Sequence, residues 1–144
     1  MPEYPIERYT DPQPWDAVQC LLCPHQCSVA PSRQGRCGVR ANRNGRLVAT
    51  NYGKVSRAEL TPAEDLPLFH FLPGSRWYRV ASVGCTMSCP FCNTARYSQV
   101  AGARVRNVEP AALAAEAKAA GAAGLFFGIN EPAVWHEYIL AAGE

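Results

Sequence analysis

Apolar and polar positions in the first half of the chain predict short strands separated by turns. Residues 39–50 are predicted to form a β-hairpin that turns at Asn44-Gly45, because Asn and Gly both accept a positive φ angle. A further short strand is expected over residues 54–60. Residues 61–76 contain three prolines and a glycine, which predict a connector without regular structure.

The second half alternates apolar runs with helix-forming sequence. Residues 77–83 predict a strand that leads into a cysteine-rich loop. Residues 110–120 predict a helix, because Pro suits the first turn and the interior is almost all Ala, Leu, Glu and Lys. The apolar run 124–129 predicts a buried parallel strand, and residues 133–142 predict another helix. This order of elements is typical of βαβ units with a parallel sheet.

The start of the chain is rich in Pro and charged residues. The first 19 residues are predicted to form an irregular arm, with Trp15 and Val18 as its contributors to the core. We therefore expect two units: residues 1–76, a small cysteine-rich and hairpin unit with its connector, and residues 77–144, an α/β unit.

Length and charge exclude several classes of protein. With 144 residues, of which 48% are hydrophobic, the chain is about one domain long and too short for a complete (β/α)₈ barrel of roughly 250 residues. The net charge of +2 gives no reason to expect a nucleic-acid or membrane-surface partner, and five arginines between residues 33 and 46 indicate a solvated surface. There is no apolar run of membrane-spanning length and no secretory signal pattern, so a cytoplasmic location is expected.

Cysteine is the most informative residue type. There are seven, an odd number that full disulfide pairing cannot accommodate, and a reducing compartment does not sustain disulfides. They form two groups, which predict two metal sites: Cys20, Cys23, Cys27 and Cys37 in the first, and Cys85, Cys89 and Cys92 in the second.

The second group has the spacing Cys-x₃-Cys-x₂-Cys. A [4Fe–4S] cluster normally takes four thiolates, so three of them leave one iron open to a substrate. The alternative is a zinc knuckle completed by a distant residue such as His70 or His25. His70, between Phe69 and Phe71, is more readily explained as a core histidine than as a ligand.

The loop 85–92, with Phe91 before its last cysteine, resembles that of the radical S-adenosylmethionine (SAM) enzymes. In that family three thiolates hold a [4Fe–4S] cluster, and SAM chelates the fourth iron through its amino and carboxylate groups. The resemblance implies that Cys85, Cys89 and Cys92 are the cluster ligands and that Phe91 contacts the adenine of SAM.

Segments 20–27, 35–40 and 67–74 are similar to the branch of pyruvate formate-lyase activating enzymes, in particular to the radical SAM enzymes of the AmmeMemoRadiSam system. Asn130 and Glu131 resemble that branch's Tyr-Asn-Glu-Pro segment, with Ile129 in place of Tyr, and are implied to bind SAM. The fold implied is α/β: the first two βα units of a partial radical SAM (TIM-like) barrel, apparently truncated at its C-terminal end.

The resemblance implies reductive cleavage of SAM to a 5′-deoxyadenosyl radical, with a low-potential electron donor such as flavodoxin or ferredoxin. A partner protein that loses a glycyl hydrogen is the implied substrate. The alternative is a non-catalytic zinc or iron–sulfur module that acts through protein interaction. Glu131 also has a second interpretation, as a carboxylate that stabilises a helix N-terminus.

The first cysteine group, Cys-x₂-Cys-x₃-Cys-x₉-Cys, is a closed set of four, and closed thiolate sites are usually structural. Zinc, or no metal at all, is favoured here over a second cluster that relays electrons.

Overall fold

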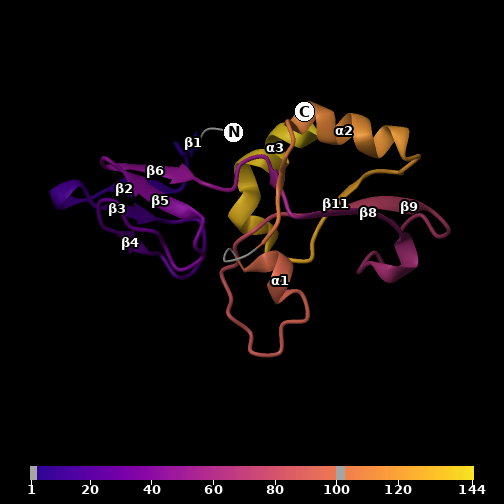
Figure 1. The fold of residues 1–144 in the computed structure, drawn as a ribbon, viewed down its shortest axis with the longest axis horizontal. Coiled ribbons are helices and arrows are strands. Elements are labelled where there is room, and N and C mark those ends of the chain that lie inside the picture. Colours follow the sequence, from indigo (N-terminus) through magenta and orange to yellow (C-terminus); the bar gives the residue numbers. More distant parts are fainter. Residues whose placement is uncertain (1–2, 100–102) are drawn as a thin grey trace.

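The computed structural model describes residues 3–99 and 103–144, and the strands in these ranges form four small sheets (Figure 1). The N-terminal strands lie at one end of the molecule, β8, β9, β11 and α2 lie at the other, and α3 lies between them. The strands are β1 (Tyr4–Pro5), β2 (Thr10–Pro12), β3 (Val18–Cys20), β4 (Ser28–Val29), β5 (Arg40–Arg43), β6 (Arg46–Ala49), β7 (Lys54–Val55), β8 (Arg57–Pro62), β9 (Arg76–Ala81), β10 (Arg106–Asn107) and β11 (Leu125–Phe127). The helices are η1 (Pro14–Asp16), η2 (Ala63–Asp65), α1 (Ala95–Ser98), α2 (Pro110–Ala119), η3 (Pro132–Trp135) and α3 (His136–Gly143).

The predicted hairpin is confirmed as β5 and β6. Arg43 pairs with Arg46, and the two turn residues between them have positive φ angles, 54° at Asn44 and 77° at Gly45. Asn42 closes the turn from inside, because its Oδ1 accepts a hydrogen bond from the Gly45 N–H at 2.9 Å. The right-handed twist of paired strands favours this type of turn.

The sheet that matters most for the functional site has the order β11–β9–β8. β8 pairs with β9 in antiparallel orientation, whereas β11 pairs with β9 in parallel, with Leu125 beside Tyr78 and Phe127 beside Val80. The carboxyl ends of β9 and β11 therefore lie at the same edge. The hydrophobic core beside this sheet combines residues of the sheet with residues of the neighbouring strands and helices: Val55, Val80, Val108, Leu113, Trp135 and Tyr138.

The predicted α/β fold is wrong. Within the described residues, three of the four sheets are wholly antiparallel, and β9–β11 is the single parallel pair. Six consecutive residue pairs join β8 to β9, so an antiparallel neighbour occupies the side of β9 where a barrel would place another parallel strand. The molecule is thus built mainly of small antiparallel sheets, and the expectation of a truncated barrel is withdrawn.

Other local predictions had mixed outcomes. The helix predicted at 110–120 is α2, which is followed by Gly121 at a φ of 69°. The prediction of an irregular N-terminal arm is wrong, because β1 and β2 lie within it, β3 begins in it, and all three pair with other strands. Val18 is buried as expected, but Trp15 is 93% exposed. His70 is also exposed and is not a core histidine.

Buried polar side chains connect the N-terminal strands to the C-terminal helices, across the predicted division at residue 76. Arg40, only 2% exposed, makes a bidentate ion pair with Glu137 at 2.8 and 2.9 Å and also donates to the Val134 carbonyl. Asn51 is fully buried and donates to the same carbonyl at 3.2 Å. One of the five arginines assigned to a solvated surface is therefore a buried structural cation.

The helices give no sign of a membrane span. Within residues 3–99 and 103–144, each helix is too short or too polar to cross a bilayer.

Removal of the Arg40 guanidinium is expected to destabilise the protein strongly. Arg40→Ala leaves the largely buried Glu137 carboxylate without its partner, which typically costs about 3–5 kcal/mol. The matched control is Arg43→Ala, which breaks an exposed ion pair with Glu3 and should cost about 0–1 kcal/mol. Urea denaturation of the metal-free proteins measures both; equal losses would show that the buried pair does not link the two parts of the chain.

Candidate functional site

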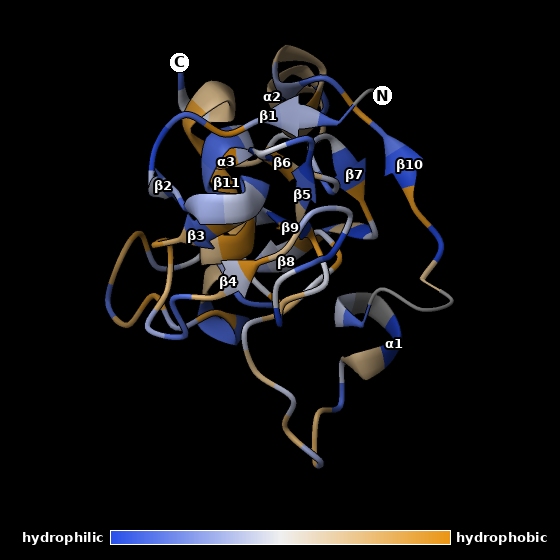
Figure 2. Ribbon diagram, turned by 90° about the vertical axis from the view of Figure 1, so that its left-hand side faces the viewer, coloured by the Kyte–Doolittle hydropathy of each residue, from blue (hydrophilic) through white to orange (hydrophobic). Residues whose placement is uncertain are grey.

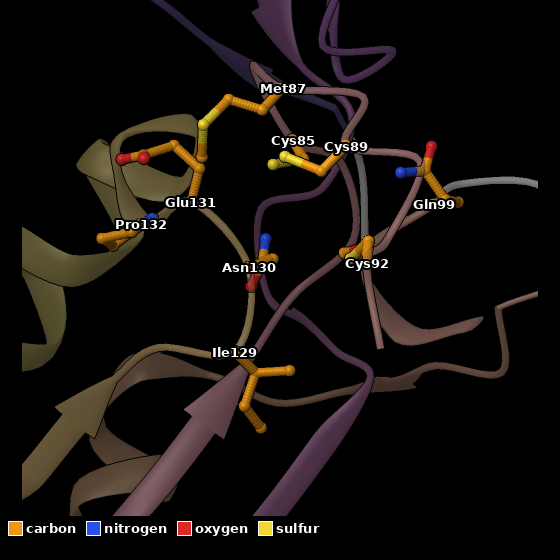
Figure 3. Close-up of a pocket in the computed structure, with 10 residues that line it drawn as sticks. Cys85, Met87, Cys89, Cys92, Gln99, Ile129, Asn130, Glu131 and Pro132 are labelled. Atoms are coloured by element: carbon orange, nitrogen blue, oxygen red, sulfur yellow. The ribbon is translucent and has the colours of Figure 1, made fainter. Parts of the chain in front are cut away.

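A cavity of about 240 Å³ lies at the shared carboxyl edge of β9 and β11 (Figure 3). Ligands of open sheets that contain parallel strands bind at this edge, because the loops that follow the strands meet there. Cysteines from the loop after β9 line one side, and residues from the loop after β11 line the other. The lining includes Cys85, Cys89, Cys92, Asn130, Glu131 and Pro132.

The cysteine loop begins at Gly84, where only glycine fits. Its φ angle is 88°, and a Cβ atom here would lie 2.6 Å from the side chain of Val39. The Gly84 N–H donates to the Ser98 carbonyl at 2.7 Å, which closes the base of the loop. The segment between these residues extends away from the body of the molecule in both views (Figures 1 and 2). The loop therefore has a fixed base and a solvent-exposed tip.

Asn130 joins the two sides of the cavity. Its Nδ2 donates to the Gly84 carbonyl at 2.8 Å, and its Oδ1 accepts from the Ser82 N–H at 3.2 Å. Both polar ends of the side chain are thus engaged by the chain that follows β9. In this structure Asn130 is a positioning residue that sets the spacing between the loops, whereas a direct SAM contact stays a prediction.

Cys92 has the most polar surroundings of the three cysteines. The hydroxyl of Thr94 lies 3.3 Å from its Sγ, and that of Ser98 lies 3.8 Å away. Hydrogen bonds from the Thr94 hydroxyl, the Thr94 backbone N–H and the Ser98 hydroxyl lower the pKa of the Cys92 thiol. Thr94 also donates to the Ile129 carbonyl at 3.0 Å, so its single hydroxyl hydrogen serves one acceptor at a time.

Glu131 lines the cavity but is engaged locally. Its Oε1 accepts a hydrogen bond from the Ala133 N–H at 3.1 Å, which makes it the N-cap of η3. Figure 3 shows its carboxylate pointing away from the three cysteines. This contact supports the interpretation of Glu131 as a helix N-terminal acid, and SAM would have to compete with it.

Phe91 is not among the residues that line the cavity. Its side chain is 85% exposed, so the structure does not bring it to the site that the resemblance implies.

The sequence interpretation missed four residues around the cavity. Met87 and Gln99 line it, and Thr94 and Ser98 hydrogen-bond to Cys92. A signal was present for the last two, because hydroxyl residues four apart lie on one face of a helical turn, and Thr94 and Ser98 are the N-cap and the last residue of α1.

The four N-terminal cysteines surround a separate cavity of about 20 Å³. All seven cysteines are free thiols. As they stand, no three His, Cys, Asp or Glu side chains within residues 3–99 and 103–144 are grouped so that they could hold a metal ion. Thiolates are nevertheless the donors that iron–sulfur clusters and zinc take, and each cysteine group lines one cavity. Each cysteine group therefore supplies the donor type that such a metal group takes, and its thiols must reorient to converge on it.

Comparison with other proteins identifies a relative but no family. The chain is 32% identical over 124 residues to the uncharacterized protein MJ0808 of Methanocaldococcus jannaschii. The alignment covers 85% of this chain, which spans about 37% of the length of that relative. No family model matches the chain. No solved structure matches it either.

Replacement of Thr94 by Val is expected to raise the pKa of Cys92 toward its ordinary value, though not fully, because the backbone N–H remains. In the metal-free protein, Cys92 should then need a higher pH to react with iodoacetamide, since the thiolate is the nucleophile. Mass spectrometry of alkylation at Cys92 as a function of pH tests this. Thr86→Val is the matched control in the same loop and should leave the profile unchanged; an identical shift in both variants would contradict the assigned hydrogen bond.

Proposed function

We propose that this chain binds a [4Fe–4S] cluster through Cys85, Cys89 and Cys92 and uses it to cleave SAM reductively. The observation that carries the proposal is that three free thiols line one 240 Å³ cavity together with Asn130 and Glu131, at the carboxyl ends of two parallel strands. The proposal rests on this site and on the resemblance of the loop, not on a barrel fold, because function resides in sites rather than in folds.

The number of thiols matters for the chemistry. Three thiolates leave one iron of the cluster for the amino and carboxylate groups of SAM. When bound and reduced, the cluster would supply one electron to the sulfonium, whose C–S bond breaks to give methionine and a 5′-deoxyadenosyl radical that takes a hydrogen atom from the substrate. The chain's own part is to hold three thiolates and orient SAM.

The residues across the cavity serve the second task. Asn130 keeps the loop after β11 at a fixed distance from the base of the cysteine loop. Glu131 carries the negative charge that suits the ammonium group of SAM, and it would exchange its contact with the Ala133 N–H for that ion pair. Met87 and Pro132 supply apolar surface beside them.

The proposal includes the partners and compartment that this chemistry requires. A low-potential donor such as flavodoxin or ferredoxin would deliver the electron, and the exposed cysteine loop gives it access to the cluster. A protein that loses a glycyl hydrogen is the proposed substrate. Seven free thiols suit the reducing cytoplasm.

Anaerobic reconstitution of the full chain with iron and sulfide tests the cluster. The protein should turn brown, its reduced EPR signal should change when SAM is added, and dithionite should yield 5′-deoxyadenosine. Cys89→Ser should lower iron content and product at least tenfold, because a hydroxyl is a poor ligand for a soft site. Cys23→Ser is the same change in the other cysteine group and should retain iron. The alternative, a non-catalytic module, would be supported if protein purified without oxygen held zinc at Cys85, Cys89 and Cys92 and took up no iron.

Loss of the Glu131 charge is expected to weaken SAM binding about tenfold. A hydrogen bond to a charged group contributes about 1.5–3 kcal/mol, and Gln keeps an oxygen that can still cap Ala133. Glu109→Gln is a control, because Glu109 also occupies the position before a helix that begins with Pro, but its side chain makes no capping hydrogen bond and it lies outside the cavity. Equilibrium dialysis with labelled SAM on the reconstituted proteins gives the affinities, and equal values for Glu131→Gln and wild type would remove Glu131 from the site.

A further inference from the structure

The four N-terminal cysteines come from three separate segments that meet around one cavity. Cys20 ends β3, Cys23 and Cys27 flank the turn that follows it, and Cys37 lies in the loop before β5. All four line the cavity. The fold thus assembles a complete set of four thiols without any contribution from the functional site described above.

Backbone hydrogen bonds hold these segments together. The Cys20 N–H donates to the Cys27 carbonyl at 2.9 Å, and the turn between them is closed by the Gln26 N–H on the Cys23 carbonyl at 3.1 Å. A second turn surrounds Cys37, where the Gly38 N–H donates to the Gly35 carbonyl at 2.9 Å. The thiols therefore project from fixed turns, and rotation about Cα–Cβ bonds is the adjustment that remains.

Two of the sulfur atoms already accept backbone hydrogen bonds. The Leu22 N–H is bonded to the Cys20 thiol, and the Arg36 N–H donates to the Cys27 Sγ at 3.5 Å. Such N–H···S contacts orient the sulfur atoms, as the outer contacts of a metal ligand do.

A buried cation provides a second, independent indication. Arg40 lines this cavity and is only 2% exposed, yet its Nε–H has no hydrogen-bond partner among the described residues. Arg36 lines the cavity as well. Four thiolates around a divalent ion carry a net charge of −2, which Arg36 would offset in part, because the charge of Arg40 is already paired with Glu137.

The small volume of the cavity favours a single metal ion over an iron–sulfur cluster. At about 20 Å³ it is close to the space that one water molecule needs, whereas the cavity proposed for the cluster and SAM is about 240 Å³. A single ion occupies this smaller space without enlarging it, whereas a cube of eight iron and sulfur atoms needs the thiols to move apart. A closed set of four thiolates is a typical ligand set for structural zinc.

We propose that Cys20, Cys23, Cys27 and Cys37 bind one Zn²⁺ ion that stabilises the N-terminal sheets and takes no part in electron transfer. The ion draws the four thiols inward from their positions around the cavity. His25 also lines the cavity, and its Nδ1 lies 3.7 Å from the Cys23 Sγ, but the four cysteines complete a tetrahedral set, so we expect His25 to stay outside it.

Metal analysis of the full chain, purified without oxygen, tests the site. We expect one zinc per chain in the wild type, a loss of at least tenfold in Cys23→Ser and Cys37→Ser, and full retention in His25→Ala and Cys89→Ser. The zinc result is independent of the proposed function, because Cys89→Ser should lose iron and keep zinc whereas Cys23→Ser should do the reverse.

Because Cys37→Ser could lose zinc simply by failing to fold, a conservative replacement at the same position serves as a second test. Cys37→His supplies another zinc ligand, so it should recover zinc that Cys37→Ser loses. Co²⁺ bound in place of zinc should show thiolate charge-transfer absorption in the wild type and weaker absorption in Cys37→His. Wild-type protein without zinc after expression in zinc-supplemented medium, or iron and sulfide bound by these four cysteines, would overturn the proposal.

Discussion

The parallel pairing of β9 with β11 is the constraint on which the candidate site depends. Because the two strands run in the same direction, the loops that follow them emerge at one edge, although they are separated by more than 40 residues of sequence. The Asn130 side chain then links the ends of both strands through two hydrogen bonds. Without this pairing, the cysteine loop and Glu131 would not line the same cavity.

Buried polar contacts attach the N-terminal sheets to this edge. The Arg40–Glu137 pair and the Asn51 amide both converge on the start of the C-terminal helices, and both bind the Val134 carbonyl. Gly84 provides the matching close approach, since its Cα packs against Val39 with no space for a Cβ. Small sheets bury little apolar surface individually, so directional contacts of this kind decide how they are arranged.

The two cysteine groups differ in the space they enclose more than in their chemistry. The N-terminal four surround a volume that suits one ion, in a segment whose core includes Cys20 itself. The other three border a cavity about twelve times larger that opens at the edge of the sheet. The contrast favours a structural role for the first group and a substrate-binding role for the second.

The sequence alone determined features that depend on neighbouring residues: the Asn44-Gly45 hairpin, helix α2 and the division of the cysteines into a four and a three. Turn conformation and helix propensity are local, so the chain's pattern was sufficient there. Tertiary structure decided that β8 occupies one side of β9, that Arg40 is buried, that Phe91 is exposed and that Asn130 links two loops. Each of these depends on contacts between residues far apart in the chain. The packing and desolvation energies of such contacts cannot be read from the local composition.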